Sequence, residues 1–323
     1  MNTILNIVAN AYSSYANYLW TEITTPSWHN YFWWLIGLSL AVWTLEIVMP
    51  WRKGQPKIRR DFWLDAWYMF FNFFVFSLIG YAAVSDVVVH FLRSGVTAIT
   101  GITSFEWIDV RALPGWSQLL ILFVARDFIQ WNVHRLLHAS PRLWEFHKVH
   151  HSVEQMGFAA HLRYHWMETI VYRTIEYLPL AFFGFGLQDF FAVHIFALTI
   201  GHLNHANFEL PIGPLKYLFN SPQMHIWHHA KDLPAGRKSV NYGISLSLWD
   251  WLFGQAYIPE SGRDIPLGFE GVESYPHSFG VNLWLHSNDK PLIARSSGAD
   301  EVMLCHLIQR GYRRLLAGVQ ATG

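Results

Sequence analysis

Residues 134–151 read HRLLHASPRLWEFHKVHH and contain five histidines. A second block, MHIWHH, covers residues 224–229 and contributes three more. The two histidines of HRLLH are spaced i, i+4, and each H-x-x-H-H block is spaced i, i+3, i+4. Such spacings place side chains on one face of a helix, so we expect each block to direct its imidazoles to one side. The eight histidines are His134, His138, His147, His150, His151, His225, His228 and His229.

This pattern indicates a metal site. Residues 134–165 hold seven of the eighteen histidines in the chain, and residues 202–229 hold five. Imidazole nitrogen is a suitable ligand for Zn, Cu, Fe and Ni. Because one metal ion cannot use eight nitrogens, three helices that project eight imidazoles into a common space imply two metal ions. The chain lacks the H-E-x-x-H motif of zinc proteases and the E-x-x-H motif of soluble di-iron bundles.

The composition indicates a membrane protein. Of all residues, 52% are hydrophobic and only 14% are charged, whereas soluble chains average about 25% charged residues. Tryptophan and phenylalanine are abundant, as in the aromatic belts of membrane interfaces. The net charge is zero and no RNA-binding motif is present, so nucleic acid is not expected as a partner. The single cysteine, Cys305, excludes an intramolecular disulfide, a cysteine-ligated zinc or iron–sulfur site and a C-x-x-C-H haem attachment.

Four apolar stretches are expected to meet the bilayer. Residues 31–50, 66–92 and 116–133 are each long enough to span it, and the basic cluster at residues 52–60 places the end of the first span in the cytoplasm. Residues 170–203 form either a hairpin of half-membrane helices or two spans, because a single span would separate the histidine blocks. We therefore predict an all-α polytopic membrane protein with about four spans, or three spans and a hairpin. A cytoplasmic helical cap is expected to carry the histidine blocks.

The same pattern divides the chain into three segments. Residues 1–30 are expected to form an N-terminal interfacial segment. Residues 31–260 form the membrane domain, with histidines at 134–151, 202–207 and 225–229. Residues 261–323 form a C-terminal tail, which either stands apart or belongs to the same domain.

The order of the motifs resembles one known family. HRLLH, FHKVHH, HAN, MHIWHH, NYG and LWDWLFG follow one another, from about Asp127 to Gly254, as in the fatty acid hydroxylase / sterol desaturase superfamily of membrane di-iron oxygenases. The resemblance implies an O2-dependent enzyme that hydroxylates an unactivated C–H bond of a membrane lipid, with a fatty acyl or sterol-like substrate. It implies two iron ions, which zinc can replace, and O2 as co-substrate. By position it adds His205, in HAN, and His165, in RYHWME, to the eight metal-ligand histidines.

Acidic and amide side chains near the motifs are candidates to hold the ring N–H of a metal-bound histidine. The principal candidates at the catalytic site are Asp127, Glu168 and Asp250, and the others are Glu145, Asn207 and Asn241. For Asp127 the alternative interpretation is a pair with Arg126 at a helix end near the interface.

Five aromatic residues close to the histidines in sequence are expected to wall a substrate slot that opens to the lipid. They are Trp131, Trp144, Phe158, Trp166 and Trp227. The alternative is ordinary packing at the membrane interface. His161 and His202 match no motif, and we expect them to be hydrogen-bonded packing residues near the site; the alternative is that either of them is a further metal ligand.

A separate electron donor is expected as a partner. The chain has no G-x-G-x-x-G fingerprint for flavin or nicotinamide and no fused cytochrome domain. We therefore expect a cytochrome b5-like or ferredoxin-like donor with its reductase, besides the membrane lipid substrate. The expected location is the bacterial inner membrane or the endoplasmic reticulum, with the histidine site facing the cytoplasm. The sequence predicts neither the substrate's identity nor the oligomeric state.

Other activities remain open on the same pattern. Desaturation, ether-lipid cleavage by a monooxygenase and C-4 demethylation of sterols would use the same site. A non-oxidative membrane protein, such as a zinc site or a metal transporter, is a second class. A bis-histidine haem carrier is a third, which the sequence disfavours because the histidine blocks lie beyond the apolar segments.

Overall fold

A computed structural model describes residues 2–28, 30–74, 94–95, 97–99, 101, 110–169, 172, 175–176, 187–234 and 236–282. These residues all belong to one compact unit, residues 1–284. They contain helices and no strand, with three isolated bridges, so the expected all-α class is confirmed for this part of the chain. The helices are α1 (Asn2–Thr24), α2 (Tyr31–Val48), α3 (Phe62–Phe70), α5 (Gly115–Ala139), α6 (Pro141–His151), α8 (Leu187–His205), α9 (Pro222–His228), α10 (Leu248–Leu252) and α11 (Phe279–Asn282). Short 3-10 turns lie at η2 (Val110–Ala112), η3 (Phe158–Leu162), η4 (Gly213–Tyr217) and η5 (Val272–Ser274).

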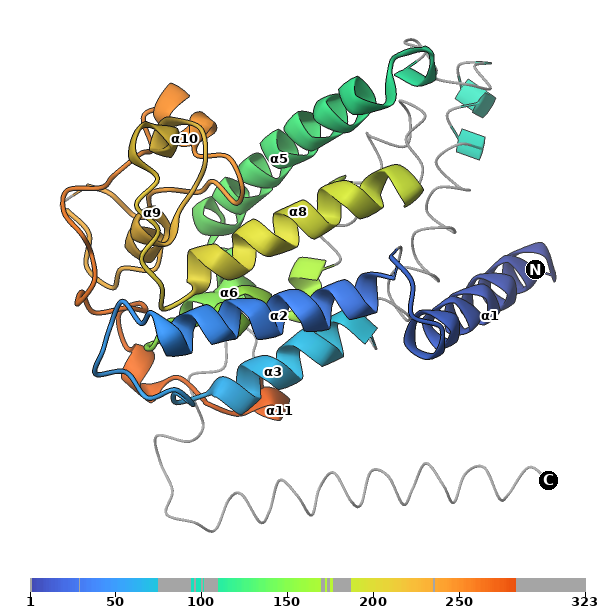
Figure 1. The fold of residues 1–323 in the computed structure, drawn as a ribbon. Helices are drawn as coiled ribbons and strands as arrows, with labels where there is room; N and C mark the ends of the chain where they lie inside the picture. Colours follow the sequence, from blue (N-terminus) through green and yellow to red (C-terminus); the bar gives the residue numbers. More distant parts are fainter. Residues whose placement is uncertain are drawn as a thin grey trace, which may run out of the picture. The chain divides into compact units, whose positions relative to one another are not determined.

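The long helices lie side by side, with α8 between α2 and α5 (Figure 1). α6 turns back against α5, and η3 packs against both α3 and α8. The short helices α9 and α10 lie near one end of this bundle (Figure 1), and α9 contacts α8. The histidine-bearing helices α5, α6, α8 and α9 thereby come together, although up to ninety-five residues separate their histidines in sequence.

Among the described residues, one helix, α2, is long and apolar enough to cross a membrane by length and composition. Its single acid, Glu46, accepts hydrogen bonds from the backbone N–H groups of Phe158, at 2.8 Å, and Asn207, at 2.7 Å. One carboxylate thus fixes the end of α2 to η3 and to the segment after α8. Residues 75–92 of the second predicted span and most of residues 170–186 lie outside the described residues, so the number of spans stays a prediction.

Both H-x-x-H-H helices begin in the same way. Ser140 precedes Pro141 at the start of α6, and Ser221 precedes Pro222 at the start of α9. Each serine hydroxyl accepts a backbone N–H of the first turn, and proline suits the first helical position because its missing N–H has no partner there anyway. A serine–proline pair therefore fixes where each histidine helix starts.

A buried ionic network ties the segment before α3 to the segment after η3. Arg163, which is almost fully buried, pairs with Asp65 and also reaches Asp61 at 3.3 Å. Arg59 pairs with the same Asp65 from the other side. The network contains two positive and two negative side chains. Each charge is therefore paired with an opposite charge, which offsets the cost of removing it from water.

The compact unit continues beyond residue 260. Leu267 packs in a core cluster with Ile226 and Trp227. The backbone N–H of Gly268 donates to the carbonyl of His229 at 2.9 Å. Phe279, in α11, packs against Tyr68 of α3. Residues 261–282 therefore contact the helices that carry the histidines.

Candidate metal centre

The structure gathers nine histidines into two neighbouring groups. In each group the ring nitrogens that can serve as ligands all lie within 4.8 Å of one another. The five-histidine group consists of His134, His138, His147, His151 and His228, and the four-histidine group consists of His150, His205, His225 and His229. The groups adjoin, since the ring centroids of His151 and His229 lie 4.4 Å apart.

Each H-x-x-H-H block divides between the two groups. In α6, His147 and His151 enter the five-histidine group, while His150 enters the other. In the second block, His225 and His229 enter the four-histidine group, while His228 crosses to the other. In each block the histidines at i and i+4 belong to one group, and the histidine at i+3 belongs to the other. The expectation that each block directs its imidazoles to one side did not include this division between two adjoining groups, which arises because consecutive residues lie about 100° apart around a helix.

The distances between ring nitrogens are those of metal ligands. The Nε2 atoms are 3.2 Å apart in His134 and His147, 3.1 Å in His205 and His225, and 3.2 Å in His225 and His229. Two nitrogens bound to one metal at about 2.1 Å, roughly 90° to 109° apart, lie about 3.0 to 3.4 Å from each other. The spacing therefore fits shared coordination by an ion.

The other ring nitrogen of several histidines is held by the protein. Nδ1 of His134 lies 2.8 Å from the Tyr242 carbonyl oxygen, and Nδ1 of His228 lies 2.7 Å from that of Val240. Nδ1 of His205 lies 2.8 Å from the Gly201 carbonyl oxygen. A carbonyl only accepts, so each Nδ1 carries the proton and each Nε2 presents a lone pair to the centre.

Four further ring nitrogens are buried without a hydrogen-bond partner. They are Nε2 of His138, His151 and His228, and Nδ1 of His229. A buried polar atom without a partner is costly, so it indicates a ligand at that place. All four atoms belong to residues of the two groups, and the three Nε2 atoms carry this argument because Nε2 of His229 is already the nitrogen spaced as a ligand. The residues present therefore fit bound metal ions.

The electrostatics also suit metal ligands. Burial, together with repulsion from neighbouring imidazoles, lowers the pKa of all six histidines of the two H-x-x-H-H blocks well below the ordinary value. These imidazoles are neutral at pH 7, and only the neutral ring offers a lone pair to a metal.

Glu168 contacts a histidine of the five-histidine group directly. Its Oε2 lies 2.7 Å from Nδ1 of His147, while its Oε1 accepts the backbone N–H of His165 at 3.4 Å. Burial raises the pKa of Glu168 to about 8. The carboxyl group orients the His147 ring with Nε2 toward the centre, which is the arrangement expected of it.

Asp127 and Asp250 lie one layer further from the centre than the sequence suggested. The Asp127 carboxylate accepts hydrogen bonds from the backbone N–H groups of Ser245 and Leu246 and from the indole N–H of Trp249. Asp250 binds the backbone N–H groups of Tyr242 and Gly243, at 2.9 and 2.8 Å. These bonds shape residues 240–246, whose carbonyls then hold His134 and His228. The two aspartates thus hold the backbone of this loop in place, and the loop carbonyls in turn orient the rings of His134 and His228.

The remaining candidates to hold a ring N–H have other partners. Glu145 pairs with Lys148 at 2.6 Å, and Asn207 accepts the backbone N–H of Arg52 at 2.8 Å. Asn241 donates to the carbonyls of Met224 and Tyr257. These three side chains connect segments of the fold.

Three other histidines lie close to the groups without joining them. His165 is buried, and its Nδ1 accepts the backbone N–H of Met167 at 3.1 Å, so its predicted place among the ligands is not reproduced. His161 and His202 contact each other through Nδ1 atoms 3.0 Å apart. Nε2 of His202 lies 3.1 Å from the Ser39 hydroxyl. His161 and His202 thus form the hydrogen-bonded packing expected of them.

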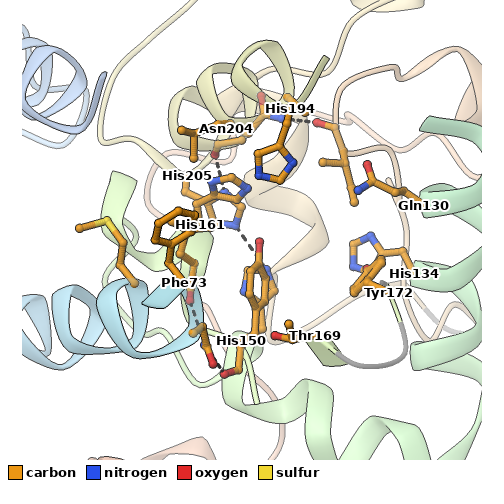
Figure 2. A pocket seen from close by; sticks show the side chains of 18 of the residues that line it. Phe73, Gln130, His134, His150, His161, Thr169, Tyr172, His194, Asn204 and His205 are labelled. Atoms are coloured by element: carbon orange, nitrogen blue, oxygen red, sulfur yellow. Dashed lines mark hydrogen bonds between the residues drawn. The ribbon is translucent and has the colours of Figure 1, made fainter. Parts of the chain in front are cut away.

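A cavity of about 150 Å³ adjoins both groups of histidines. Its lining includes His134 and His147 from one group and His150, His205 and His225 from the other. Figure 2 shows His134 from α5, His150 from α6 and His205 from α8 around the space. The apolar part of the wall comes from Met69, Phe73, Leu162, Ala197 and Leu198.

The five aromatic residues expected to wall a substrate slot do not line this cavity. The indole N–H of Trp131 donates to Asp250 at 2.8 Å, and that of Trp227 donates to the Glu260 carbonyl at 3.1 Å. Trp144 packs on the rings of His138 and His151. Phe158 packs on Phe62 and His202, and Trp166 stacks on His165. Neighbouring residues on a helix point about 100° apart, so adjacency in sequence to a histidine does not bring a side chain to this cavity.

A second set of polar residues lines the cavity and was missed by sequence analysis. Arg126 pairs with Glu176, and its Nη2 lies 3.3 Å from Nδ1 of His194. The Nε2 amide of Gln130 donates to Glu176 at 3.2 Å. One signal was available: Arg126, Gln130, His134 and His138 follow one another at intervals of four, on one face of α5.

The sequence matches the family model described as fatty acid hydroxylase over residues 119–255. Among similar curated proteins, the ornithine lipid hydroxylase OlsE of Rhizobium tropici is 33% identical over 154 residues, 48% of this chain and 46% of that protein. The alkylglycerol monooxygenase of Homo sapiens is 32% identical over 220 residues, 67% of this chain and 45% of that protein. A very-long-chain aldehyde decarbonylase, GL1-10 of Oryza sativa subsp. japonica, is 26% identical over 245 residues, covering 70% and 75%.

This chain thus spans less than half the length of the first two relatives. No solved structure matches it. The matched segment contains all nine clustered histidines, both aspartates that shape residues 240–246 and the loop that holds His134 and His228. Residues 119–255 of this chain therefore form a domain of the fatty acid hydroxylase family.

Proposed function

We propose that this protein is an O2-dependent di-iron hydroxylase that acts on an unactivated C–H bond of a membrane lipid. The observation that carries the proposal is the set of nine buried imidazoles in two adjoining groups, with ring nitrogens at metal-ligand spacing around one cavity. The family match and the relatives named hydroxylase and monooxygenase support the reaction class.

The proposed metal ions are two irons, one in each group. Bound iron would supply the redox chemistry that activates O2 for attack on an aliphatic C–H bond. The chain's own task is to hold the ligands in place. Glu168 orients His147, the carbonyls of residues 240–242 orient His134 and His228, and the packed walls of the cavity keep water away from the reacting carbon. His165 stays a candidate ligand that its present contact with Met167 does not favour.

The proposed substrate enters from the membrane. α2 has the length and hydropathy of a spanning helix, and α5 exposes Trp116, Leu120 and Ile121 outward. Large exposed apolar side chains of this kind suit contact with lipid. We propose residues 31–260 as the membrane oxygenase domain, with the histidine site at its cytoplasmic face in a bacterial inner membrane or the endoplasmic reticulum. A separate cytochrome b5-like or ferredoxin-like donor with its reductase is proposed to supply electrons.

The test is turnover of native lipids with labelled oxygen. Membranes that contain the iron-loaded protein are incubated with ¹⁸O₂, a reductase system and the polar lipids of the host, and the products are identified by mass spectrometry. The proposal expects a lipid that has gained one ¹⁸O atom, and loss of this product in His150→Ala and His228→Ala. A product that has lost two hydrogens without the label would instead show desaturation. Full iron content with no oxidised lipid would overturn the proposal in favour of a non-oxidative metal protein.

A further inference from the structure

The wall that α5 contributes to the cavity contains an acceptor that no described residue satisfies. Gln130 lines the cavity, its side chain is 8% exposed, and its Oε1 is buried without a hydrogen-bond partner. A buried acceptor without a partner is costly, and a native structure keeps one where a ligand supplies the donor.

The orientation of this amide is fixed by its neighbour. The Glu176 carboxylate pairs with the guanidinium of Arg126 and can only accept hydrogen bonds. The amide nitrogen of Gln130 must therefore face Glu176, as its 3.2 Å contact shows. This leaves Oε1 as the free atom, and rotation of the amide by 180° would place two acceptors against each other. The partner that would satisfy Oε1 of Gln130 is therefore a hydrogen-bond donor, either a hydroxyl or an N–H group.

Gln130 also lies close to the candidate metal centre. It precedes His134 by four residues on α5, so the two side chains are neighbours on one helix face, about 5 to 6 Å apart at Cβ. Figure 2 shows Gln130 and His134 extending from α5 on the same side of the cavity. Both line the same space of about 150 Å³, a volume that holds a group about the size of benzene. A donor bound at Gln130 therefore leaves room for only a few more atoms before the histidines.

From this geometry we infer that Gln130 is a substrate-specificity residue, which binds a hydroxyl or amide N–H of a lipid and places a carbon a few bonds away at the metal centre. The inference rests on the proposed function. It specifies the substrate class as a lipid with a hydrogen-bond donor in its polar part, oxidised close to that donor and not in the middle of an acyl chain. Glu176 and Arg126 are positioning residues, because they hold the amide of Gln130 in its orientation.

Binding of matched probes tests the donor requirement without any turnover. The probes are 1-hexadecanol with its methyl ether, and N-butylhexadecanamide with its N-methyl derivative, each measured by equilibrium binding to the metal-loaded, full-length protein in micelles. An unmade hydrogen bond at a buried acceptor weakens binding about tenfold or more. We expect this preference for the donor-bearing member in at least one pair. Equal binding within both pairs, or no binding at all, would overturn the inference.

A variant assigns the preference to Gln130. Gln130→Met keeps the length of the side chain and removes the acceptor, so it is expected to abolish the preference while metal content stays unchanged. Asn132→Leu is the matched control, since Asn132 is exposed on the same helix and bonds only the Phe128 carbonyl in the described residues. If Gln130→Met folds poorly, the comparison of probes on the unaltered protein still tests whether the cavity requires a hydrogen-bond donor. A preference that persists in a folded Gln130→Met protein would contradict the assignment.

The position of oxidation separates this inference from the proposed function. We expect the ¹⁸O atom of any oxidised lipid to lie within about four bonds of a hydroxyl or N–H, as the cavity size requires. Oxidation in the middle of a chain would overturn the inference and leave the hydroxylase proposal standing. A preference for the donor-bearing probe without oxidation of any lipid would overturn the hydroxylase proposal and leave the donor-binding role of Gln130 standing.

Discussion

Nε2 of His205 lies 3.1 Å from Nε2 of His225, although twenty residues separate them in sequence. Nδ1 of His205 is committed as a donor to the Gly201 carbonyl, so its Nε2 presents a lone pair to the neighbouring ring. Two ring nitrogens at this distance share either a proton or a bound cation, and the second arrangement is the one that the proposed metal centre uses. In this pair the protein fixes one side of the His205 ring and leaves the other side for the proposed metal ion.

The first prediction concerns the unequal size of the two groups. His205→Ala leaves three imidazoles in the four-histidine group, whereas His138→Ala still leaves four in the other. Because a closed metal site uses about four ligands, we expect His205→Ala to lose about one metal ion per chain and His138→Ala to retain both. Elemental analysis of the purified, folded proteins measures this.

His165→Gln is the matched control for that experiment. His165 is as buried as the ligands but lies in neither group. Its substitution is expected to leave the metal content unchanged. A loss of metal in His165→Gln as large as that in His205→Ala would restore His165 to the ligand set.

The second prediction concerns the carboxyl group behind His147. Glu168→Ala removes the group that holds Nδ1 of His147. Loss of such a partner typically weakens metal binding by about 10- to 100-fold. Competition with a chelator measures the affinity, and Glu145→Ala serves as the control because Glu145 pairs with Lys148 and not with a ring. Equal affinities in the two variants would show that Glu168 does not act through the metal ligand.

The third prediction compares two helical glycines. A Cβ atom at Gly201 would overlap the ring of His161, whereas one at Gly37 would meet nothing within 4 Å. Gly201→Ala must displace His161 from its contact with His202, so we expect it to destabilise the protein by about 1–3 kcal/mol. Gly37→Ala is expected to be neutral or to stabilise by about 0.5–1 kcal/mol, because alanine loses less backbone freedom in a helix. Melting temperatures in detergent distinguish the two, and equal shifts would be the contrary result.

The fourth prediction concerns the pH dependence of stability. Burial alone would raise the pKa of Asp61, but Arg163 and His277 outweigh it and hold the pKa below its usual value. A lowered pKa in the folded state stabilises the protein above the unfolded value of about 3.9, and this contribution is lost as pH falls through the folded pKa.

Asp61→Asn removes this contribution and keeps a residue that tolerates the positive φ of 64° at this position. We therefore expect Asp61→Asn to have a lower melting temperature than the unaltered protein at pH 7. The difference between the two melting temperatures is expected to shrink below about pH 4. A difference that is constant from pH 7 to pH 3 would mean that Asp61 acts through its shape and not through its charge.

The helical form of the histidine blocks was predictable, because the i, i+4 intervals need only the geometry of one helix. The serine–proline starts are a second local signal, which the spacing argument left unused. The meeting of the blocks was also predictable, since buried imidazoles in such numbers need a shared ligand. The division of each block between two groups was not, because it depends on how α5, α8 and the block helices are rotated against one another.

Side chains of long-range partners were the least predictable. Asp127 was assigned to the histidines because it lies near them in sequence, yet it binds backbone at residues 245 and 246, more than a hundred positions away. Gln130 and Arg126 lie at exact four-residue intervals from His134 but attract notice only once Glu176 is placed beside them. The periodicity of the sequence predicts which residues share a face of a helix. The residues that contact this face are known only once the fold is known.

The divided histidine blocks constrain how this protein can change over time. α6 supplies ligands to both centres, and so does the second block with α9. Insertion or deletion of one residue within either block would rotate the following histidine by about 100° and damage both centres at once. Neither α6 nor the second block can therefore shift without altering both groups, so the two histidine groups are coupled through these blocks.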